Sequence, residues 1–187
     1  MPRAVAMTAF IETYMGQRFT PLAPKADTIL VEDVAHALSQ QIRFSGHCEL
    51  SYSVAEHCVR VAWRVKELGG TKEEQFWGLL HDASEAYLVD LPTPLKRHWL
   101  FGFFYRWAER RLMKAICRKF RMPVEQPQIV YTADAELLAT EVRDLMPGLP
   151  EHWGGLGRPL REHIGPWSAR RAEREFLMQF RFLEGER

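Results

Sequence analysis

The decapeptide Gly-Leu-Leu-His-Asp-Ala-Ser-Glu-Ala-Tyr at positions 78–87 contains the most informative pair of residues in the chain, His81 and Asp82. Phe76 and Leu80, one helical turn apart, predict a short helix with a buried apolar face just before this pair. An unpaired carboxylate at the end of a buried helix would cost several kcal/mol. We therefore expect a divalent cation to compensate the charge of Asp82.

Helical spacing continues on both sides of this segment. Thr71 with Glu74, and Ser53 with Glu56, form the capping-box pattern that marks the start of a helix. The expected helices cover residues 32–42, 53–68, 71–82, 98–120, 128–145 and a final segment capped by Ser168. Little of the chain alternates with period two. The sequence therefore predicts an all-α fold, one compact bundle of six or seven helices.

Size and composition set limits on the class of protein. A chain of 187 residues, 47% hydrophobic and 26% charged, is predicted to form one globular domain over residues 1–187. The net charge of +1, without a long Lys/Arg block, argues against binding of nucleic acid polymers or membranes. Three cysteines without a CxxC pair fit a reducing cytoplasm. No apolar run approaches the ~20 residues that span a membrane.

Four residues form a candidate ligand set: His57, His81, Asp82 and Asp134. Taken singly, each has a structural explanation, such as a core histidine or a helix-capping aspartate. Taken together, with the His-Asp pair at a helix end, they favour a metal site. Imidazole and carboxylate ligands suit Mn, Fe, Co, Ni or Zn better than Ca.

These residues carry a resemblance to a known family. His57 in Ser-Val-Ala-Glu-His, the pair in Leu-His-Asp, and Asp134 in Ala-Asp-Ala-Glu resemble the H…HD…D pattern of the HD-domain metal-dependent phosphohydrolases. The run at 81–96 is similar to that of the bacterial 5′-deoxynucleotidases and of phage-type HD enzymes, including dATP triphosphohydrolases. Two stretches that precede His57, Glu32–Ser39 and Arg43–His47, look more like the phage-type group. The resemblance covers a motif core of about 30–145 and leaves out the C-terminal loop and helix, 146–187.

The resemblance implies roles for individual residues. His57, His81, Asp82 and Asp134 would hold a divalent metal ion (Co, Mn, Zn, Mg or Fe, one or more per subunit). Glu85, one helical turn past the His-Asp pair, would orient or deprotonate the attacking water. Asp90 would act with Glu85 or help to hold a second metal.

Substrate contacts follow from the same resemblance. Arg43 and Lys96 are the expected phosphate clamps, because both would offset negative charge as a P–O bond breaks. Phe44 stands where the deoxynucleotidases carry a Trp that limits space around the sugar, which leaves a preference for deoxyribose open. His47 would contact phosphate or base.

An aromatic stripe at Trp99, Phe103, Phe104 and Trp107 is interpreted as core or as a subunit contact. Proteins of the resembled family are oligomers, so the resemblance implies a homo-oligomer.

The resulting expectation is a cytoplasmic, metal-dependent phosphohydrolase whose substrate is a deoxynucleotide. Hydrolysis of a dNTP is slightly favoured over release of phosphate from a dNMP. A non-catalytic nucleotide-binding module is the alternative from another class of protein. Hydrolysis of a signalling nucleotide is a third possibility, with the same chemistry.

Overall fold

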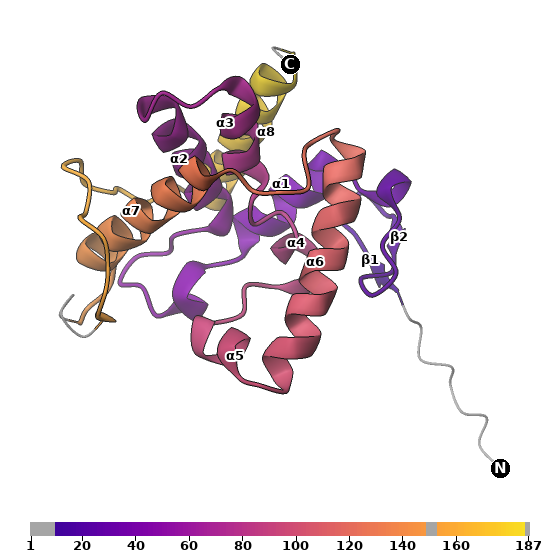
Figure 1. The fold of residues 1–187 in the computed structure, drawn as a ribbon, viewed down its shortest axis with the longest axis horizontal. Helices are drawn as coiled ribbons and strands as arrows, with labels where there is room; N and C mark the ends of the chain where they lie inside the picture. Colours follow the sequence, from indigo (N-terminus) through magenta and orange to yellow (C-terminus); the bar gives the residue numbers. More distant parts are fainter. Residues whose placement is uncertain (1–9, 149–152, 186–187) are drawn as a thin grey trace.

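The computed structural model describes residues 10–148 and 153–185, and their regular secondary structure is helical apart from one small hairpin (Figure 1). The α-helices are α1 (Val31–Gln40), α2 (Val54–Glu67), α3 (Lys72–Leu80), α4 (Glu85–Leu88), α5 (Thr93–Arg97), α6 (Phe101–Lys119), α7 (Gln128–Leu145) and α8 (Ala169–Gly185). Two 3-10 turns, η1 (Ala26–Thr28) and η2 (Arg43–Gly46), lie on either side of α1. The all-α prediction is confirmed. Within the described ranges, six helices have nine or more residues, and the short α4 and α5 were not expected.

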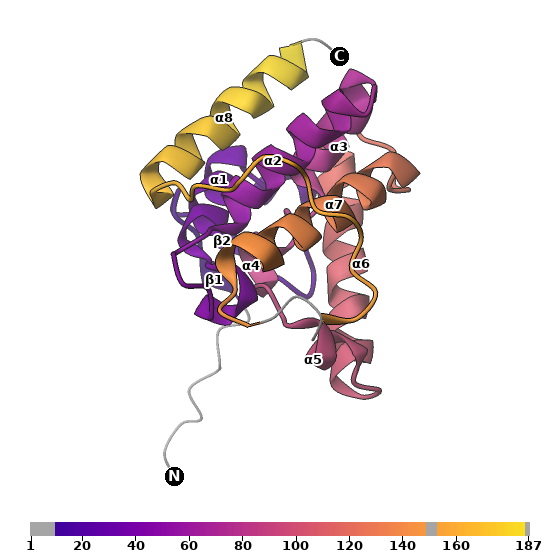
Figure 2. The ribbon, with the colours of Figure 1, turned by 90° about the vertical axis from the view of Figure 1, so that its left-hand side faces the viewer.

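Helix α2 lies at the centre of the fold, in contact with α1, α3, α7 and α8 (Figure 2). Its apolar face explains this position, since Val54, Cys58, Val61 and Val65 recur at helical spacing and are fully buried. Cys58 is thus a core residue. Because α2 packs against both α3 and α7, residues on these three helices that are far apart in sequence lie close together.

The predicted helix starts agree with the structure, with one difference. Thr71 and Glu74 form a complete capping box at α3. Ser53 accepts a hydrogen bond from the Glu56 backbone N–H at α2, but the Glu56 side chain does not return to Ser53. Glu56 is fully buried and instead accepts hydrogen bonds from Arg60 and from the backbone N–H of Trp167. It therefore ties the segment before α8 to α2.

A small antiparallel hairpin, β1 (Ile11–Glu12) and β2 (Arg18–Phe19), was not predicted. Strands of two residues are too short to show alternation. The hairpin is held to α1 by Asp33, which accepts hydrogen bonds from the Thr13 hydroxyl (2.9 Å) and the Met15 backbone N–H (2.7 Å). The contact spans about twenty residues, so local pattern does not reveal it.

The apolar residues of α6 and its flanks differ in burial between the start and the end of the helix. Leu112, Ile116 and Phe120 are buried, whereas Trp99, Phe103, Phe104 and Trp107 are 77%, 56%, 61% and 41% exposed. The interpretation of these four as core of this chain is therefore wrong, and a subunit contact stays a prediction. In the described part of the chain, no helix combines the length and apolarity needed to cross a membrane.

Candidate metal centre

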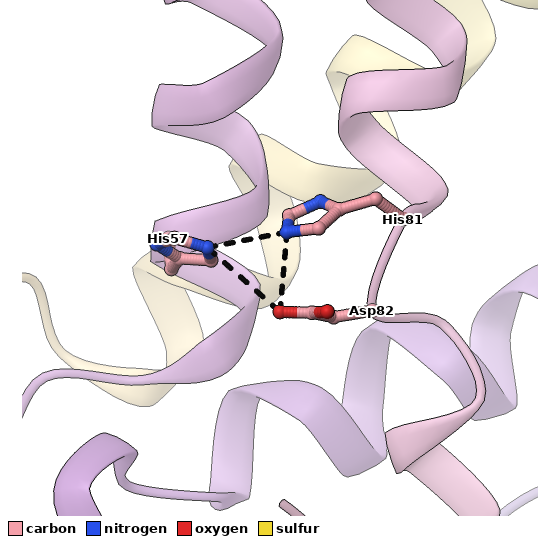
Figure 3. A group of neighbouring side chains, drawn as sticks. All are labelled: His57, His81 and Asp82. Carbon is pink, nitrogen blue, oxygen red and sulfur yellow. Dashed lines mark hydrogen bonds and ion pairs between the residues drawn. The ribbon is translucent and has the colours of Figure 1, made fainter. Parts of the chain in front are cut away.

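His57, His81 and Asp82 direct polar atoms at one point and could hold a metal ion (Figure 3). His57 lies near the start of α2, and the other two follow the last turn of α3. His57 Nε2 lies 3.3 Å from His81 Nε2 and 3.8 Å from Asp82 Oδ2, and His81 Nε2 lies 3.2 Å from that oxygen. Asp134 of α7 lies beside this group, with Oδ1 3.2 Å from His57 Nε2, although it is outside the set of three whose ligand atoms all lie within 4.8 Å of one another. We call these four residues the His/Asp cluster.

The other ring nitrogen of each histidine has a hydrogen-bond acceptor. His57 Nδ1 lies 2.6 Å from Glu141 Oε1, and both side chains are fully buried. His81 Nδ1 lies 2.7 Å from the backbone oxygen of Gly78. A carboxylate or a carbonyl oxygen only accepts, so Nδ1 donates in both rings. In the neutral rings, both Nε2 lone pairs therefore face the centre of the cluster, as metal ligands require.

The spacing of these atoms fits a coordination sphere. Ligands about 2.1 Å from a metal are separated by about 3.0 Å along an octahedral edge and about 3.4 Å along a tetrahedral edge. The three separations among His57, His81 and Asp82 are 3.2, 3.3 and 3.8 Å, and Asp134 Oδ1 lies 3.2 Å from His57 Nε2. Two imidazole nitrogens and the Asp82 carboxylate, with the Asp134 carboxylate beside His57, are donors typical of Mn, Fe, Co or Zn. The residues present therefore fit a divalent transition metal.

The electrostatics of the cluster favour positive charge at its centre. Burial opposes the charged form of His81, yet Asp82 raises its pKa well above the ordinary value. Burial and Arg43 oppose charge on His57, but Glu141 and Asp134 raise its pKa as well. Burial alone would raise the pKa of Asp82, whereas His81 holds it far below the ordinary value. A divalent cation supplies the positive charge that these groups favour.

Glu141 of α7 supports the cluster from behind. Besides His57, it accepts a hydrogen bond from Arg43 Nε at 3.0 Å, and Arg43 Nη1 lies 3.7 Å from Asp82 Oδ2. Although burial acts against its charged form, Arg43 and His57 lower the pKa of Glu141. Arg43 follows Ile42, whose bridge with Ser53 closes the loop between them. The guanidinium of Arg43 is therefore held by the carboxylates of Glu141 and Asp82. Arg43 also lines a cavity beside the cluster.

A cavity of about 600 Å³ adjoins the cluster, and we call it the main cleft. Asp82 and Asp134 lie in its wall, together with every other residue predicted for catalysis or substrate binding. These are Arg43, Phe44, His47, Glu85, Asp90 and Lys96. The structure thus brings all ten predicted site residues to one region, with the two histidines beside Asp82 rather than among the residues that line the main cleft.

Glu85 and Lys96 form an ion pair at this wall, with Lys96 Nζ 2.9 Å from Glu85 Oε1. Lys96 Nζ also lies 3.5 Å from Glu109 Oε1 on α6. The second oxygen of Glu85, Oε2, is buried and has no hydrogen-bond partner among the described residues. Burial, followed by Asp82, raises the pKa of Glu85 to about 8, despite Lys96. Glu85 is therefore a carboxyl group that can carry a proton near neutral pH.

Two stretches of backbone at the main cleft are strained. Phe44 and Ser45 have φ angles of 55° and 53°, and Val89 has φ 64° and ψ 157°. Such conformations are uncommon without glycine, and for a β-branched residue they are outliers. Val89 is held by hydrogen bonds from its N–H to Glu85 and from Tyr105 to its carbonyl oxygen. This turn leads directly into Asp90, whose N–H donates to Gln41.

Several residues of the site were not singled out from the sequence. Glu141 carries a signal, because it falls seven residues after Asp134 on the same face of one helix. Glu109 and Trp153 carry none, since their places depend on tertiary packing. Trp153 lines the main cleft and contacts the ring of Phe44 edge-on, with 5.6 Å between ring centres.

Comparison with known proteins identifies relatives. No protein-family model matches the chain. The chain is 38% identical over 137 residues to the uncharacterized protein YfdR of Escherichia coli K12, covering 73% of this chain and 72% of YfdR. It is 34% identical over 116 residues to an uncharacterized protein of Rhodobacter capsulatus, covering 60% of this chain and 58% of that protein. Neither name states an activity.

Proposed function

The chain belongs to the same protein family as YfdR, and we propose that it is a divalent-metal-dependent phosphohydrolase of the HD type that acts on deoxynucleotides. The observation that carries the proposal is the orientation of the two histidines. Glu141 and Gly78 occupy their Nδ1 atoms, so both Nε2 atoms face Asp82 and a shared centre. A purely structural histidine pair has no need of such an arrangement.

The main cleft supports phosphate chemistry next to this centre. A bound divalent cation would polarise a phosphate oxygen and lower the pKa of water. Lys96 and Arg43 place positive charge on the wall of the same cleft, where they would hold phosphate oxygens. Glu85 carries or accepts a proton at neutral pH, and Lys96 fixes the position of its carboxyl group. Asp90 lines the cleft beside Glu85 and would act with it.

The cleft also supports a nucleoside as the non-phosphate part of the substrate. Phe44, Leu138, Met146 and Trp153 line it, which gives an apolar wall for a base and sugar. His47 lines the same cleft and would contact base or phosphate. We further propose that Phe44 limits the space around the sugar and so favours deoxyribose. We also propose that the protein is a cytoplasmic homo-oligomer, assembled through the exposed aromatic residues of α6.

The proposal is tested by hydrolysis assays on metal-stripped protein resupplied with Mn, Co, Mg or Zn. We expect metal-dependent turnover of one or more deoxynucleotides in a panel of dNMPs and dNTPs. Asp82→Ala should abolish it, because a ligand and its charge are lost together. Asp27→Ala, an exposed aspartate on η1, is the matched control and should retain wild-type turnover. Full turnover by Asp82→Ala, or nucleotide binding without any hydrolysis, would refute the enzymatic assignment.

A further inference from the structure

A second cavity of about 340 Å³ opens onto the His/Asp cluster, and we call it the second cleft. Its walls come from the end of α3, from α6 and from α7. Asp82 and Asp134 line the second cleft as well as the main cleft. The cluster therefore lies between two openings, and a molecule bound at the cluster can extend into both.

The two clefts differ in chemistry. The main cleft is larger, at about 600 Å³, and has the apolar wall described above. The second cleft is lined by the guanidinium-bearing Arg110 and by the polar side chains of Ser84, Gln126 and Tyr131, with Trp77, Met113 and His81 completing its wall. The first four of these residues supply hydrogen-bond donors, and Arg110 adds a positive charge. The second cleft holds the volume of roughly ten water molecules, which is enough for two phosphate groups.

We propose that the second cleft is a binding subsite for the terminal phosphates of a nucleoside triphosphate, with Arg110 as its principal contact. The inference rests on the proposed function and deepens it, since it selects triphosphates over monophosphates as the substrate class. The nucleoside lies in the main cleft, the phosphate next to it lies at the His/Asp cluster, and the remaining phosphates lie in the second cleft. A monophosphate would leave the second cleft unused.

The acidic residues of the second cleft are consistent with this assignment. Asp82 and Asp134 belong to the cluster, where a divalent cation would offset their charge. Glu109, the other carboxylate in the wall, lies 3.5 Å from Lys96 Nζ. Lys96 is shared with Glu85, which is closer at 2.9 Å. Among the described residues, Arg110 is the one lysine or arginine in the wall of the second cleft, and it would attract the terminal phosphates.

Two variants of α6 test the subsite. Arg110 is exposed, so Arg110→Ala should fold. Arg111→Ala is the matched control, because Arg111 is also exposed but lies over the Trp107 ring and outside the cleft wall. Binding of inorganic triphosphate and of orthophosphate to the Mn-loaded proteins is measured by calorimetry. We expect Arg110→Ala to weaken triphosphate binding about tenfold more than orthophosphate binding, and Arg111→Ala to match the wild type.

The outcomes separate this inference from the proposed function. Equal triphosphate affinity in Arg110→Ala and wild type would overturn the subsite, as would triphosphate binding no tighter than orthophosphate in the wild type. In both cases, orthophosphate bound to the metal-loaded cluster leaves the phosphohydrolase proposal standing. If neither anion binds, both proposals fail. Hydrolysis of dNMPs with no hydrolysis of dNTPs would overturn the subsite alone.

Discussion

Replacing Glu141 by Gln should weaken both the fold and metal binding. Glu141 is fully buried and accepts hydrogen bonds from two buried donors, His57 Nδ1 at 2.6 Å and Arg43 Nε at 3.0 Å. Glutamine keeps the shape but has one acceptor oxygen, so it can serve only one of the two donors. It also removes the negative charge that balances Arg43, whose other carboxylate contact, Asp82, lies 3.7 Å away.

The size of the effect follows from the burial of these groups. Breaking a buried, charge-assisted pair by removing one partner costs on the order of 2–4 kcal/mol. For a domain of this size, that corresponds to a fall in Tm of roughly 5–15 °C. Loss of the acceptor that orients a ligating histidine lowers metal affinity by about 10–100-fold.

The assay is thermal unfolding of the metal-free protein combined with calorimetric titration of Mn²⁺. Glu136→Gln is the control, because Glu136 lies on the same helix and pairs with Arg64 at 2.7 Å, with both side chains partly exposed. We expect it to cost less than about 1 kcal/mol and to leave Mn²⁺ affinity unchanged. Wild-type Mn²⁺ affinity in Glu141→Gln would refute the reasoning, and so would equal Tm changes in the two variants.

Two further predictions concern the wall of the main cleft. In metal-free protein, the pKa of Glu85 is raised from 4.5 to about 8, so the folded state keeps a proton that the unfolded chain releases. The free energy of unfolding should therefore fall as pH rises from about 5 to 8, and Glu85→Gln should flatten this fall; parallel profiles would contradict it. Val89→Gly should raise the free energy of unfolding by about 1 kcal/mol in denaturant titrations. The backbone at φ 64° is strained for a β-branched residue but not for glycine, and the Val89 side chain, which is 59% exposed, contributes little packing. A destabilised variant would show that the strain is absent.

The helical fold was predictable because its signals lie within short stretches of sequence. Thr71 and Ser53 mark helix starts, and the buried face of α2 recurs at helical spacing over four turns. The hairpin of β1 and β2 was not predictable, since Asp33 holds it through hydrogen bonds across about twenty residues. Periodicity also did not show which apolar residues of α6 face the core, because apolar residues occur in both its buried and its exposed parts.

The candidate site was predictable to the extent that residue type and helical position reveal it. A histidine and an aspartate at the end of a buried helix, and Asp134 on an apolar face, are each unusual enough to notice. Of the groups that orient the two histidines, Glu141 carries a signal in its position on α7, whereas the backbone oxygen of Gly78 carries none. Glu56 has the capping-box position yet serves Trp167, and Glu109 reaches the site only through the packing of α6. Such roles depend on contacts between distant segments, which a single sequence does not encode locally.

The most direct test of the account is anomalous diffraction from crystals of the Mn-loaded protein at the manganese edge. We predict one strong peak bound by His57 Nε2, His81 Nε2, Asp82 and Asp134, at about 2.0–2.3 Å from each ligand atom. The same peak should be lost in Asp82→Ala. A manganese ion bound elsewhere, with these four side chains directed apart, would contradict the assignment of a metal centre.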